Sequence, residues 1–556
     1  MKRTKIVCTL GPASWSEDVL RQLIEAGMDV ARFNFSHGDH ETHGRTLDRL
    51  RKLADEAGRP VAALADLQGP KIRVGRFKDG PIELQSGDKF VITIDDILGD
   101  QERVSTTYKE LPKDVEVGET LLLADGLLEM KAIEVTKTDV VCEVIHGGPL
   151  SNNKGINLPE TRVSAPSLTE KDRKDLEYAI ERKFDLVALS FVRRPQDVLD
   201  AQVVIHKART RIPVIAKIER AEAVEQLEDI IDTAGGIMIA RGDLGVELPP
   251  ENVPIIQKRI LERCNTIGVP VITATQMLES MIENPRPTRA EASDVANAIF
   301  DGTDAVMLSG ETATGKFPVR AVKMMARIAE KAEASRFDNI PDRYELDPFA
   351  SVEDAVANSS VLAADMLEAS LMAVYTVSGA TANRVAKYRP KVPIYAMTCS
   401  KKAARRLAVR WGVNPIIVPI VEDFDELFVK VEEVFGEMGL VKNGDIVVIT
   451  AGVPLARPGT TNCIKVHRVE HGEAATKGVS EHSGVKVKLC KCINCGLCVR
   501  MCPEGIFEME GDIISVSPDK ASCCIKDGLC VEACPAAAIE IDGSHLGYDK
   551  MKTPDR

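Results

Sequence analysis

The feature that most constrains this chain is a series of eight short apolar segments, each of which ends in polar or charged residues. The segments are Lys5–Leu10, Val30–Phe35, Val61–Leu67, Leu186–Phe191, Val214–Glu219, Gly236–Asp243, Pro270–Gln276 and Ala305–Gly310. Apolar runs of this length are typical of parallel strands that are buried on both faces. Helical patterns follow most of them, at Ser16–Ala26, Glu170–Arg182 and Ala290–Phe300 among others. Eight strand–helix units predict an α/β chain built on a (β/α)₈ barrel.

Side chains suited to catalysis gather where these segments end. They are Arg32, Asn34, Ser36, Asp66, Lys217, Glu219, Asp243, Thr275, Ser309 and Glu311. A barrel brings the C-terminal ends of its strands to one mouth, where barrel enzymes have their active sites. Lys217 and Glu219 are two positions apart and therefore share one face of a strand. Alone they would be interpreted as a surface ion pair, but together with the other strand ends they predict an enzyme.

Length and charge narrow the class of protein. The chain has 556 residues, of which 44% are hydrophobic, and a formal net charge of −13. This length predicts about three or four domains, and the negative charge argues against a nucleic acid or an anionic membrane as partner. No apolar run reaches the roughly 18 residues of a membrane span, and the N-terminus has no signal-peptide core. We therefore expect a cytoplasmic protein.

The texture of the sequence changes along the chain. From Arg73 to about Val163, short β-rich runs alternate with turn residues, which predicts a small all-β domain inserted between barrel strands three and four. An insertion at this position would lie at the barrel mouth. There it is interpreted as a mobile lid or as a rigid addition to the fold. A further α/β unit and a polar linker follow. The expected boundaries are residues 1–70 and 164–338 for the barrel, 71–163 for the lid, 345–471 for the α/β domain, 472–484 for the linker and 485–556 for a cysteine-rich domain.

The strand-end residues are suited to phosphoryl chemistry. Glu219 and Asp243 can hold one Mg²⁺, which commonly takes one or two carboxylates and completes its shell with substrate oxygens. Lys217 and Arg32 would then flank a transferring phosphoryl group. Gly242 allows backbone N–H groups to approach an anion. Each of these residues alone is more often a turn residue, so the prediction depends on their joint placement.

From Lys5 to about Glu470, the chain resembles the pyruvate kinases. The resemblance rests on long motifs: Asn34–Gly38, Val214–Glu219, Ala240–Gly245, Ala274–Met281, Asn284–Ala290, Ser293–Ala298 and Met307–Thr312. The family implies phosphoryl transfer from phosphoenolpyruvate to ADP, which gives pyruvate and ATP, with Mg²⁺ or Mn²⁺ as cofactor. It also implies a mobile lid and a homotetramer.

The resemblance assigns roles residue by residue. Arg32 would bind the phosphoryl group, and Lys217 would stabilise its charge and the developing enolate. Glu219 and Asp243 would hold the divalent cation. The backbone at Gly242 and the side chain of Thr275 would bind the pyruvate carboxylate, and Thr275 lies on the expected route of enolate protonation. The nucleotide side would consist of Asn34, His37 and Arg73.

The family's monovalent-cation site matches only in part. Its ligands would be Asn34, Ser36, Asp66 and the carbonyl of Leu67. The neighbouring residues Leu67, Gln68, Lys71 and Val74 are similar to those of the K⁺-independent group. The Lys71 ammonium can supply the positive charge that K⁺ would otherwise bring, so we expect that K⁺ is not required.

The second α/β unit resembles the family's regulatory domain. The residues of its first strand–helix loop are Thr376, Ser378, Gly379, Ala380 and Thr381. In the family, this loop binds the phosphate of an allosteric effector, and hydroxyls before a helix are suited to a phosphate. The alternative is an ordinary capped helix start.

Nine of the 14 cysteines lie between Cys490 and Cys534, which marks a separate metal-binding module. The spacing Cys492-x₂-Cys495-x₂-Cys498-x₃-Cys502-Pro503 is that of a bacterial-type ferredoxin motif, whereas a Cys₄ zinc site usually has two separated pairs. A second copy begins at Cys524 and ends in Cys530-x₃-Cys534.

This module resembles a ferredoxin with two iron–sulfur clusters. The first cluster would take Cys492, Cys495, Cys498 and Cys534, and the second would take Cys502, Cys524 and Cys530. Asp527 stands where the second cluster's remaining cysteine belongs. This cluster would therefore be a [4Fe–4S] cluster with an aspartate ligand or a [3Fe–4S] cluster. Between Ile506 and Val516 we expect a hairpin that turns at Gly511-Asp512.

The sequence thus predicts a cytoplasmic pyruvate kinase with a fused iron–sulfur domain, for which redox sensing and electron transfer with a redox partner are the two interpretations. One alternative is another phosphoenolpyruvate or pyruvate barrel enzyme, such as a metal-dependent aldolase. The other is an electron carrier that uses the barrel as a scaffold. A complete set of catalytic side chains argues against a scaffold.

Overall fold

The structure is a computed structural model. It describes residues 2–159, 161–335, 351–421, 423–455, 459–469, 480–482, 484–487, 496–510, 513–525, 530–531, 534 and 538–541. The chain divides into two compact units. The first comprises residues 1–427 with 447–466, and the second comprises residues 428–446 with 467–556.

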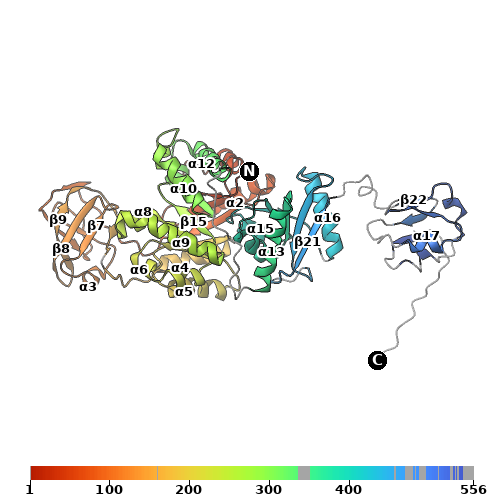
Figure 1. Ribbon diagram of the computed structural model, residues 1–556. Coiled ribbons are helices and arrows are strands. Elements are labelled where there is room, and N and C mark those ends of the chain that lie inside the picture. Colours follow the sequence, from red (N-terminus) through yellow and green to blue (C-terminus); the bar gives the residue numbers. More distant parts are fainter. Residues whose placement is uncertain are drawn as a thin grey trace, which may run out of the picture. The chain divides into compact units, whose positions relative to one another are not determined.

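The first unit contains a closed barrel of parallel strands in the order β1-β16-β15-β14-β13-β12-β3-β2 (Figure 1). The strands are β1 (Lys5–Thr9), β2 (Val30–Asn34), β3 (Ala62–Asp66), β12 (Leu186–Leu189), β13 (Val214–Ile218), β14 (Gly236–Ala240), β15 (Val271–Ala274) and β16 (Ala305–Leu308). The predicted barrel is confirmed, with each strand ending one or more residues earlier than expected. The largest difference is at β14, after which residues 241–247 form a helix, so Asp243 lies on that helix and not on a strand.

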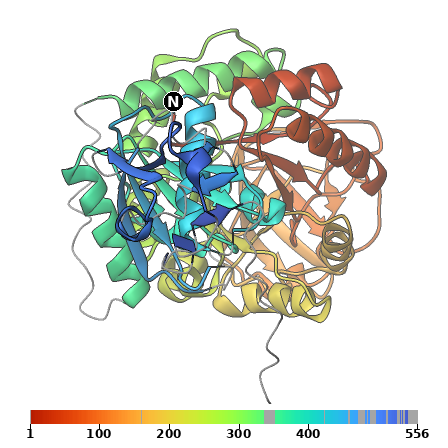
Figure 2. The same ribbon diagram turned by 90° about the vertical axis from the view of Figure 1, so that its right-hand side faces the viewer.

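Helices surround the barrel, as Figure 2 shows for those coloured red, yellow and green. They are α1 (Glu17–Ala26), α2 (His40–Glu56), α4 (Glu170–Glu181), α5 (Pro195–Lys207), α6 (Ala221–Glu225), α7 (Leu227–Thr233), α8 (Arg241–Glu247), η1 (Pro250–Asn252), α9 (Val253–Ile267), η2 (Glu279–Ile282), α10 (Arg289–Phe300), α11 (Gly310–Ala313) and α12 (Pro318–Glu333). Ser16 caps α1, and Thr169 and Thr288 form capping boxes at α4 and α10. Such caps satisfy N–H groups that a helix start leaves free.

The inserted lid forms a six-stranded sheet in the order β11-β7-β8-β9-β5-β6 and a two-stranded sheet, β10-β4. Its elements are β4 (Ile82–Leu84), β5 (Lys89–Thr93), β6 (Arg103–Ser105), α3 (Leu111–Asp114), β7 (Thr120–Leu123), β8 (Leu128–Val135), β9 (Asp139–His146), β10 (Gly148–Leu150) and β11 (Ile156–Asn157). The predicted β-rich insertion is confirmed, with the single helical turn α3 as an addition. Its core includes Phe90, Ile92, Leu121 and Met130.

The second α/β domain has a five-stranded sheet in the order β19-β18-β17-β20-β21. Its elements are α13 (Val352–Met366), β17 (Leu371–Tyr375), α14 (Ala380–Lys387), β18 (Ile394–Thr398), α15 (Lys401–Leu407), β19 (Val413–Ile417), α16 (Phe424–Glu437), β20 (Ile446–Ala451) and β21 (Cys463–Arg468). Ala408 and Val409 of this domain pack with the apolar side chains inside the barrel, such as Val7 and Met307. The expected α/β domain is confirmed.

In the second unit, residues 480–541 form two small sheets. Their elements are β22 (Ser480–His482), β23 (Val485–Val487), α17 (Leu497–Met501), β24 (Phe507–Glu510), β25 (Ile513–Val516), η3 (Ala521–Cys523) and β26 (Ile539–Ile541). The pairing of β24 with β25 confirms the predicted hairpin. The predicted turn at Gly511-Asp512 and most of the predicted linker 472–484 lie outside the described residues.

Candidate active site and iron–sulfur module

Three charged side chains meet at the C-terminal ends of β2, β3 and β13. Nε of Arg32 donates to Oδ2 of Asp66 at 2.6 Å, and Nζ of Lys217 lies 3.4 Å from Oδ1 of the same carboxylate. Burial alone would raise the pKa of Asp66, but the cations of Lys217 and Arg32 outweigh it and lower that pKa. Asp66 is therefore an anion that fixes both cations at the barrel mouth.

Lys217 is the most strongly held cation of the group. Its ammonium lies 2.8 Å from Oε1 of Glu219 and donates to Oγ of Ser190 at 2.7 Å. Burial lowers its pKa, yet the carboxylates of Asp66 and Glu219 more than compensate, so the pKa lies above its usual value. The amine is thus charged at neutral pH and can stabilise a negative charge that develops beside it.

Glu219 and Asp243 fit a divalent cation. Burial and repulsion from the negative charge of Asp243 raise the pKa of Glu219, although the ammonium of Lys217 opposes the shift. A cation between them would relieve this repulsion. Nζ of Lys71 lies 3.3 Å from Oδ1 of Asp243 and is the positive charge beside it here. Within the described residues, no cluster of three or more His, Cys, Asp or Glu side chains is arranged as a metal site, and a Mg²⁺ site with two carboxylates does not need one.

Thr275 and Gly242 are hydrogen-bonded to each other at the barrel mouth. The Gly242 N–H donates to Oγ1 of Thr275 at 2.7 Å, and that hydroxyl donates to the carbonyl of Ala274. Thr275 has a φ of 68°, which is unusual for a β-branched residue and is typical of functional sites. Arg241 supports this backbone, because its Nη2 donates to the Thr275 carbonyl at 2.8 Å and it forms an ion pair with Asp294.

The residues expected on the nucleotide side lie on the loop after β2 and at the entry to the lid. Burial and the cations of Arg73, Arg32 and Lys71 lower the pKa of His37, so all three positive charges act on this histidine. Nη1 of Arg73 donates to the Asn153 carbonyl within the lid. Oδ1 of Asn34 accepts from the Ser36 N–H at 3.1 Å.

A cleft of about 640 Å³ opens between the barrel mouth and the lid. Its lining includes Lys71, Asp125, Gly242, Asp243 and Thr275. The predicted carboxylate-binding and metal-binding residues Gly242, Asp243 and Thr275 therefore face one open space large enough for a substrate with a nucleotide phosphate.

Two contributors were missed by sequence reasoning. Ser190 follows β12, where its hydroxyl accepts from Lys217 and donates to the Leu67 carbonyl at 2.7 Å. Arg241 was recognised only as part of the motif Ala240–Gly245, without a role of its own. Ser190 lies next to the end of the predicted strand Leu186–Phe191. This position could have identified it as a residue of the site.

The predicted effector loop follows β17. The Gly379 N–H donates to Oγ1 of Thr376 at 3.0 Å, the Ala380 N–H to Oγ of Ser378 at 3.4 Å, and the Thr381 hydroxyl bonds to that of Thr461. Gly379 has a φ of 92°, and a Cβ there would approach Leu407 to 3.3 Å. Helix α14 begins after Gly379 without a side-chain cap, so its first turn presents backbone N–H groups.

In the second unit, three predicted cluster ligands line one small pocket: Cys502, Cys524 and Cys530. Burial and the two neighbouring thiols raise the pKa of Cys530 to about 11. Each cysteine of a cluster binds a different iron, so these sulfurs need not be as close together as the ligands of one ion. The chemistry and grouping of the thiols fit an iron–sulfur cluster.

Two predicted ligands of the other cluster are also described. Cys498 is buried in the apolar core of the unit, and Cys534 packs against that core. Sγ of Cys534 accepts the N–H of Ala538 at 3.3 Å, and backbone hydrogen bonds to ligand sulfurs tune such clusters. The predicted ligands Cys492, Cys495 and Asp527 lie outside the described residues.

A barrel with a fixed cation and two neighbouring carboxylates at its mouth defines a barrel enzyme. Comparison with known families identifies which one: residues 1–322 match the pyruvate kinase barrel domain, residues 354–467 the pyruvate kinase alpha/beta domain and residues 491–538 the 4Fe-4S dicluster domain. The chain belongs to the pyruvate kinase family and has a 4Fe–4S dicluster domain at its C-terminal side.

Individual relatives agree. The chain is 50% identical to a pyruvate kinase of Geobacillus stearothermophilus over 487 residues, which cover 87% of this chain and 83% of the relative. It is 46% identical to a pyruvate kinase of Staphylococcus aureus over 493 residues, or 88% and 84% of the two chains. The crystal structure of a pyruvate kinase from Cryptosporidium parvum matches with a TM-score of 0.79 and 38% identity, covering 84% of this chain and 96% of that one. In the described part of this chain, no helix has the length and apolar character of a membrane span.

Proposed function

We propose that the chain transfers the phosphoryl group of phosphoenolpyruvate to ADP at the C-terminal mouth of the barrel, with Lys217 as the central catalytic residue. The supporting observation is the buried Lys217 ammonium, held by Glu219, Asp66 and Ser190 beside the cleft. A cation fixed in this way requires little reorganisation when charge moves from the phosphoryl group to the enolate. The family membership favours this reaction over that of a metal-dependent aldolase.

The other groups divide the substrate between them. Arg32 binds the transferring phosphoryl group together with Lys217, because Asp66 and the hydroxyl of Thr9 fix its guanidinium. The Gly242 N–H and the Thr275 hydroxyl turn from each other to the carboxylate of the substrate. Thr275 then lies on the path by which the enolate receives its proton. Asn34, His37 and Arg73 bind the nucleotide.

Glu219 and Asp243 hold the divalent cation, Mg²⁺ or Mn²⁺. When bound, this ion neutralises charge on the phosphoryl oxygens and orients them for in-line transfer. Two residues of this chain replace the monovalent cation of other family members in part: Lys71 supplies a positive charge beside Asp243, and Lys217 neutralises Asp66. Asn34, Ser36, Asp66 and the Leu67 carbonyl therefore need no K⁺.

Replacement of Lys217 by Met tests this proposal. The variant loses the fixed positive charge, so we expect turnover to fall on the order of 10²–10³-fold or more, as for other preorganised charges. The assay couples ADP-dependent pyruvate formation to NADH oxidation. The control is Lys52→Met, because Lys52 is an exposed lysine on α2. Near-normal turnover of a folded Lys217→Met variant would refute the assignment.

We propose the domain boundaries expected from the sequence: residues 1–70 and 164–338 for the barrel, 71–163 for the lid, 345–471 for the regulatory domain, 472–484 for the linker and 485–556 for the ferredoxin-like domain. We propose that the lid closes over the cleft and that the chain is a cytoplasmic homotetramer. The loop from Thr376 to Thr381 binds the phosphate of an effector. Support for this last role is a glycine with positive φ and the hydroxyls of Thr376, Ser378 and Thr381 at the start of a helix of eight residues.

The ferredoxin-like domain holds two iron–sulfur clusters of unequal character. One is bound by Cys492, Cys495, Cys498 and Cys534, and the other by Cys502, Cys524 and Cys530 with Asp527. The shared pocket of the last three thiols supports the second set. The oxygen of Asp527 is a harder ligand than a thiolate and binds the unique iron less firmly. Redox sensing or electron transfer to a partner is the role of this domain.

A further inference from the structure

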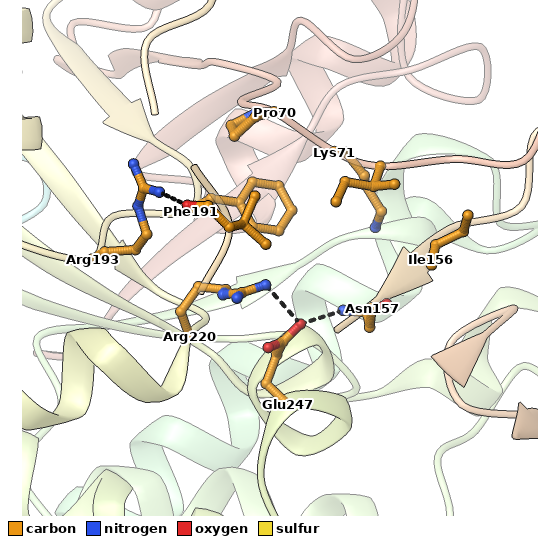
Figure 3. A pocket seen from close by; sticks show the side chains of 10 residues that line it. Pro70, Lys71, Ile156, Asn157, Phe191, Arg193, Arg220 and Glu247 are labelled. Carbon is orange, nitrogen blue, oxygen red and sulfur yellow. Dashed lines mark hydrogen bonds and ion pairs between the residues drawn. The ribbon is translucent and has the colours of Figure 1, made fainter. Parts of the chain in front are cut away.

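One buried carboxylate joins three segments of the active site. Oε1 of Glu247 accepts from Nδ2 of Asn157 at 2.9 Å and from Nη1 of Arg220 at 3.2 Å (Figure 3). Nη2 of Arg220 also donates to the Thr161 carbonyl at 3.1 Å. The side chains of Glu247 and Arg220 are only 1% and 7% exposed. This network is thus an internal connection and not a surface ion pair.

Each of the three segments has a separate place in the site. Glu247 is the last residue of α8, whose first turn contains Gly242 and Asp243. Arg220 directly follows Glu219, at the end of β13. Asn157 and Thr161 lie on residues 156–163, by which the chain returns from the lid to the barrel. We call these residues the lid return segment. The segments of the two proposed metal ligands and the lid return segment are therefore connected through Glu247 and Arg220.

Burial of the Glu247 carboxylate costs free energy, and this cost indicates that the residue has a role beyond packing. Burial raises the pKa of Glu247, although Arg220 and Asn157 oppose the shift. Its Oε2 is buried and has no hydrogen-bond partner among the described residues. A buried carboxylate with an unsatisfied oxygen contributes less to stability than an apolar side chain of similar size would. Packing alone does not explain a glutamate here.

A small pocket adjoins this network. Its volume is about 20 Å³, and its lining includes Ile72 from the lid entry and Ile156 and Val163 from the lid return segment. Phe191 and Arg193 of the barrel complete one wall (Figure 3). Nη1 of Arg193 donates to the Val163 carbonyl, so the lid return segment is bonded to the barrel beside this pocket as well as at Glu247 and Arg220.

We propose that Glu247 is a positioning residue through which the lid return segment and the metal-binding carboxylates are coupled. When the lid return segment bonds to Glu247, α8 and the Glu219–Arg220 turn are held so that Asp243 and Glu219 share one cation. Binding of the cation in turn favours the lid position in which Asn157 reaches Glu247, because coupling between two sites is reciprocal. This inference rests on the proposed metal-binding role of Glu219 and Asp243.

Three variants of the full chain test the coupling. Glu247→Gln keeps the shape of the side chain but removes the charge that pairs with Arg220. Asn157→Ala removes only the bond to the lid return segment. The matched control is Glu222→Gln, because Glu222 binds the same guanidinium, at 3.3 Å from Nε of Arg220, but from α6. Thermal midpoints establish that each variant is folded.

The readouts do not depend on catalysis. The first is the affinity for Mn²⁺ without substrate, measured by EPR, and the second is hydrogen exchange of the amides of residues 156–163 with and without Mn²⁺. In the wild type we expect Mn²⁺ to slow this exchange. Glu247→Gln should bind Mn²⁺ about tenfold more weakly, which corresponds to about 1.4 kcal/mol, and should lose the metal-dependent protection. Asn157→Ala should also lose that protection, and Glu222→Gln should keep it.

The outcomes separate this inference from the proposed function. Unchanged Mn²⁺ affinity and unchanged protection in Glu247→Gln would overturn the coupling, and so would equal effects in the Glu222→Gln control. Asp243→Asn tests the metal site itself, because it should bind Mn²⁺ far more weakly than Glu247→Gln or Asn157→Ala. If Asp243→Asn binds Mn²⁺ normally, the proposed metal site is wrong, whatever Glu247 does.

Discussion

The ammonium of Lys217 lies 2.8 Å from Oε1 of Glu219, and both side chains are almost fully buried at the end of β13. The charges of Glu219 and Asp66 keep the lysine protonated in spite of its burial. Glu219 thus provides a counter-ion for the positive charge that Lys217 places inside the barrel.

Activity should require Mg²⁺ or Mn²⁺ but show little dependence on K⁺. The physical reason is that Lys71 and Lys217 already supply positive charge at Asp243 and Asp66. Titration of KCl against tetramethylammonium chloride at constant ionic strength measures this. Lys71→Gln should lower turnover in the absence of K⁺. A large activation of the wild type by K⁺ would refute the charge-substitution argument.

Lys5 should make the stability of the barrel depend on alkaline pH. It is buried, donates to the Val413 carbonyl at 2.6 Å, and burial lowers its pKa from 10.5 to about 8. Between these values the unfolded chain binds more protons than the folded one, so the free energy of unfolding rises with pH. Relative to Lys5→Met, the wild type should gain up to about 3 kcal/mol from pH 8 to pH 10.5.

Urea denaturation of both proteins at pH 7.5, 9 and 10, followed through the transition of the barrel, measures this difference. Comparison with the Met variant cancels the titration of groups that the two chains share. Below pH 8 the lysine is charged in both states and its contribution is constant. A difference between the two chains that does not change with pH would contradict the prediction.

The iron–sulfur domain should contain two clusters that respond differently to oxidation. The cluster with Asp527 has one oxygen ligand, so mild oxidation should convert it first to a three-iron form. Asp527→Cys should make it resistant. Iron and sulfide analysis with EPR on anaerobically purified protein measures both forms. Stoichiometric zinc without iron would show that the module is a zinc site.

Removal of the residues after 472 should leave a folded kinase. The second family-matched region ends at residue 467, and the iron–sulfur region begins only at residue 491. Circular dichroism, size-exclusion chromatography and the coupled assay on the shortened chain measure the result. Assays of the full chain in its oxidised and reduced forms then show whether the clusters regulate turnover. A shortened chain that cannot fold would give the tail a structural role.

The sequence predicted the elements well because their patterns are local. Apolar runs between helical segments were sufficient for all eight barrel strands, and the alternation of short strands and turns was sufficient for the lid. Lys217 and Glu219 were predicted to act together because strand geometry places residues i and i+2 on one face. Cysteine spacing likewise predicted the type of cluster, since close ligands in the chain are close in space.

What the sequence did not predict depends on residues that are far apart in the chain. Asn157 and Glu247 are 90 positions apart, and Ser190 and Lys217 are 27 apart. No local pattern relates such residues, because only closure of the barrel and return of the chain from the lid bring them together. Asp243 was expected at a strand end, yet it lies on α8, where Arg241 and Glu247 fix its position at opposite ends of one helix. Local pattern decided which residues form the strands and where their reactive ends lie, whereas long-range packing decided which buried charges share a partner.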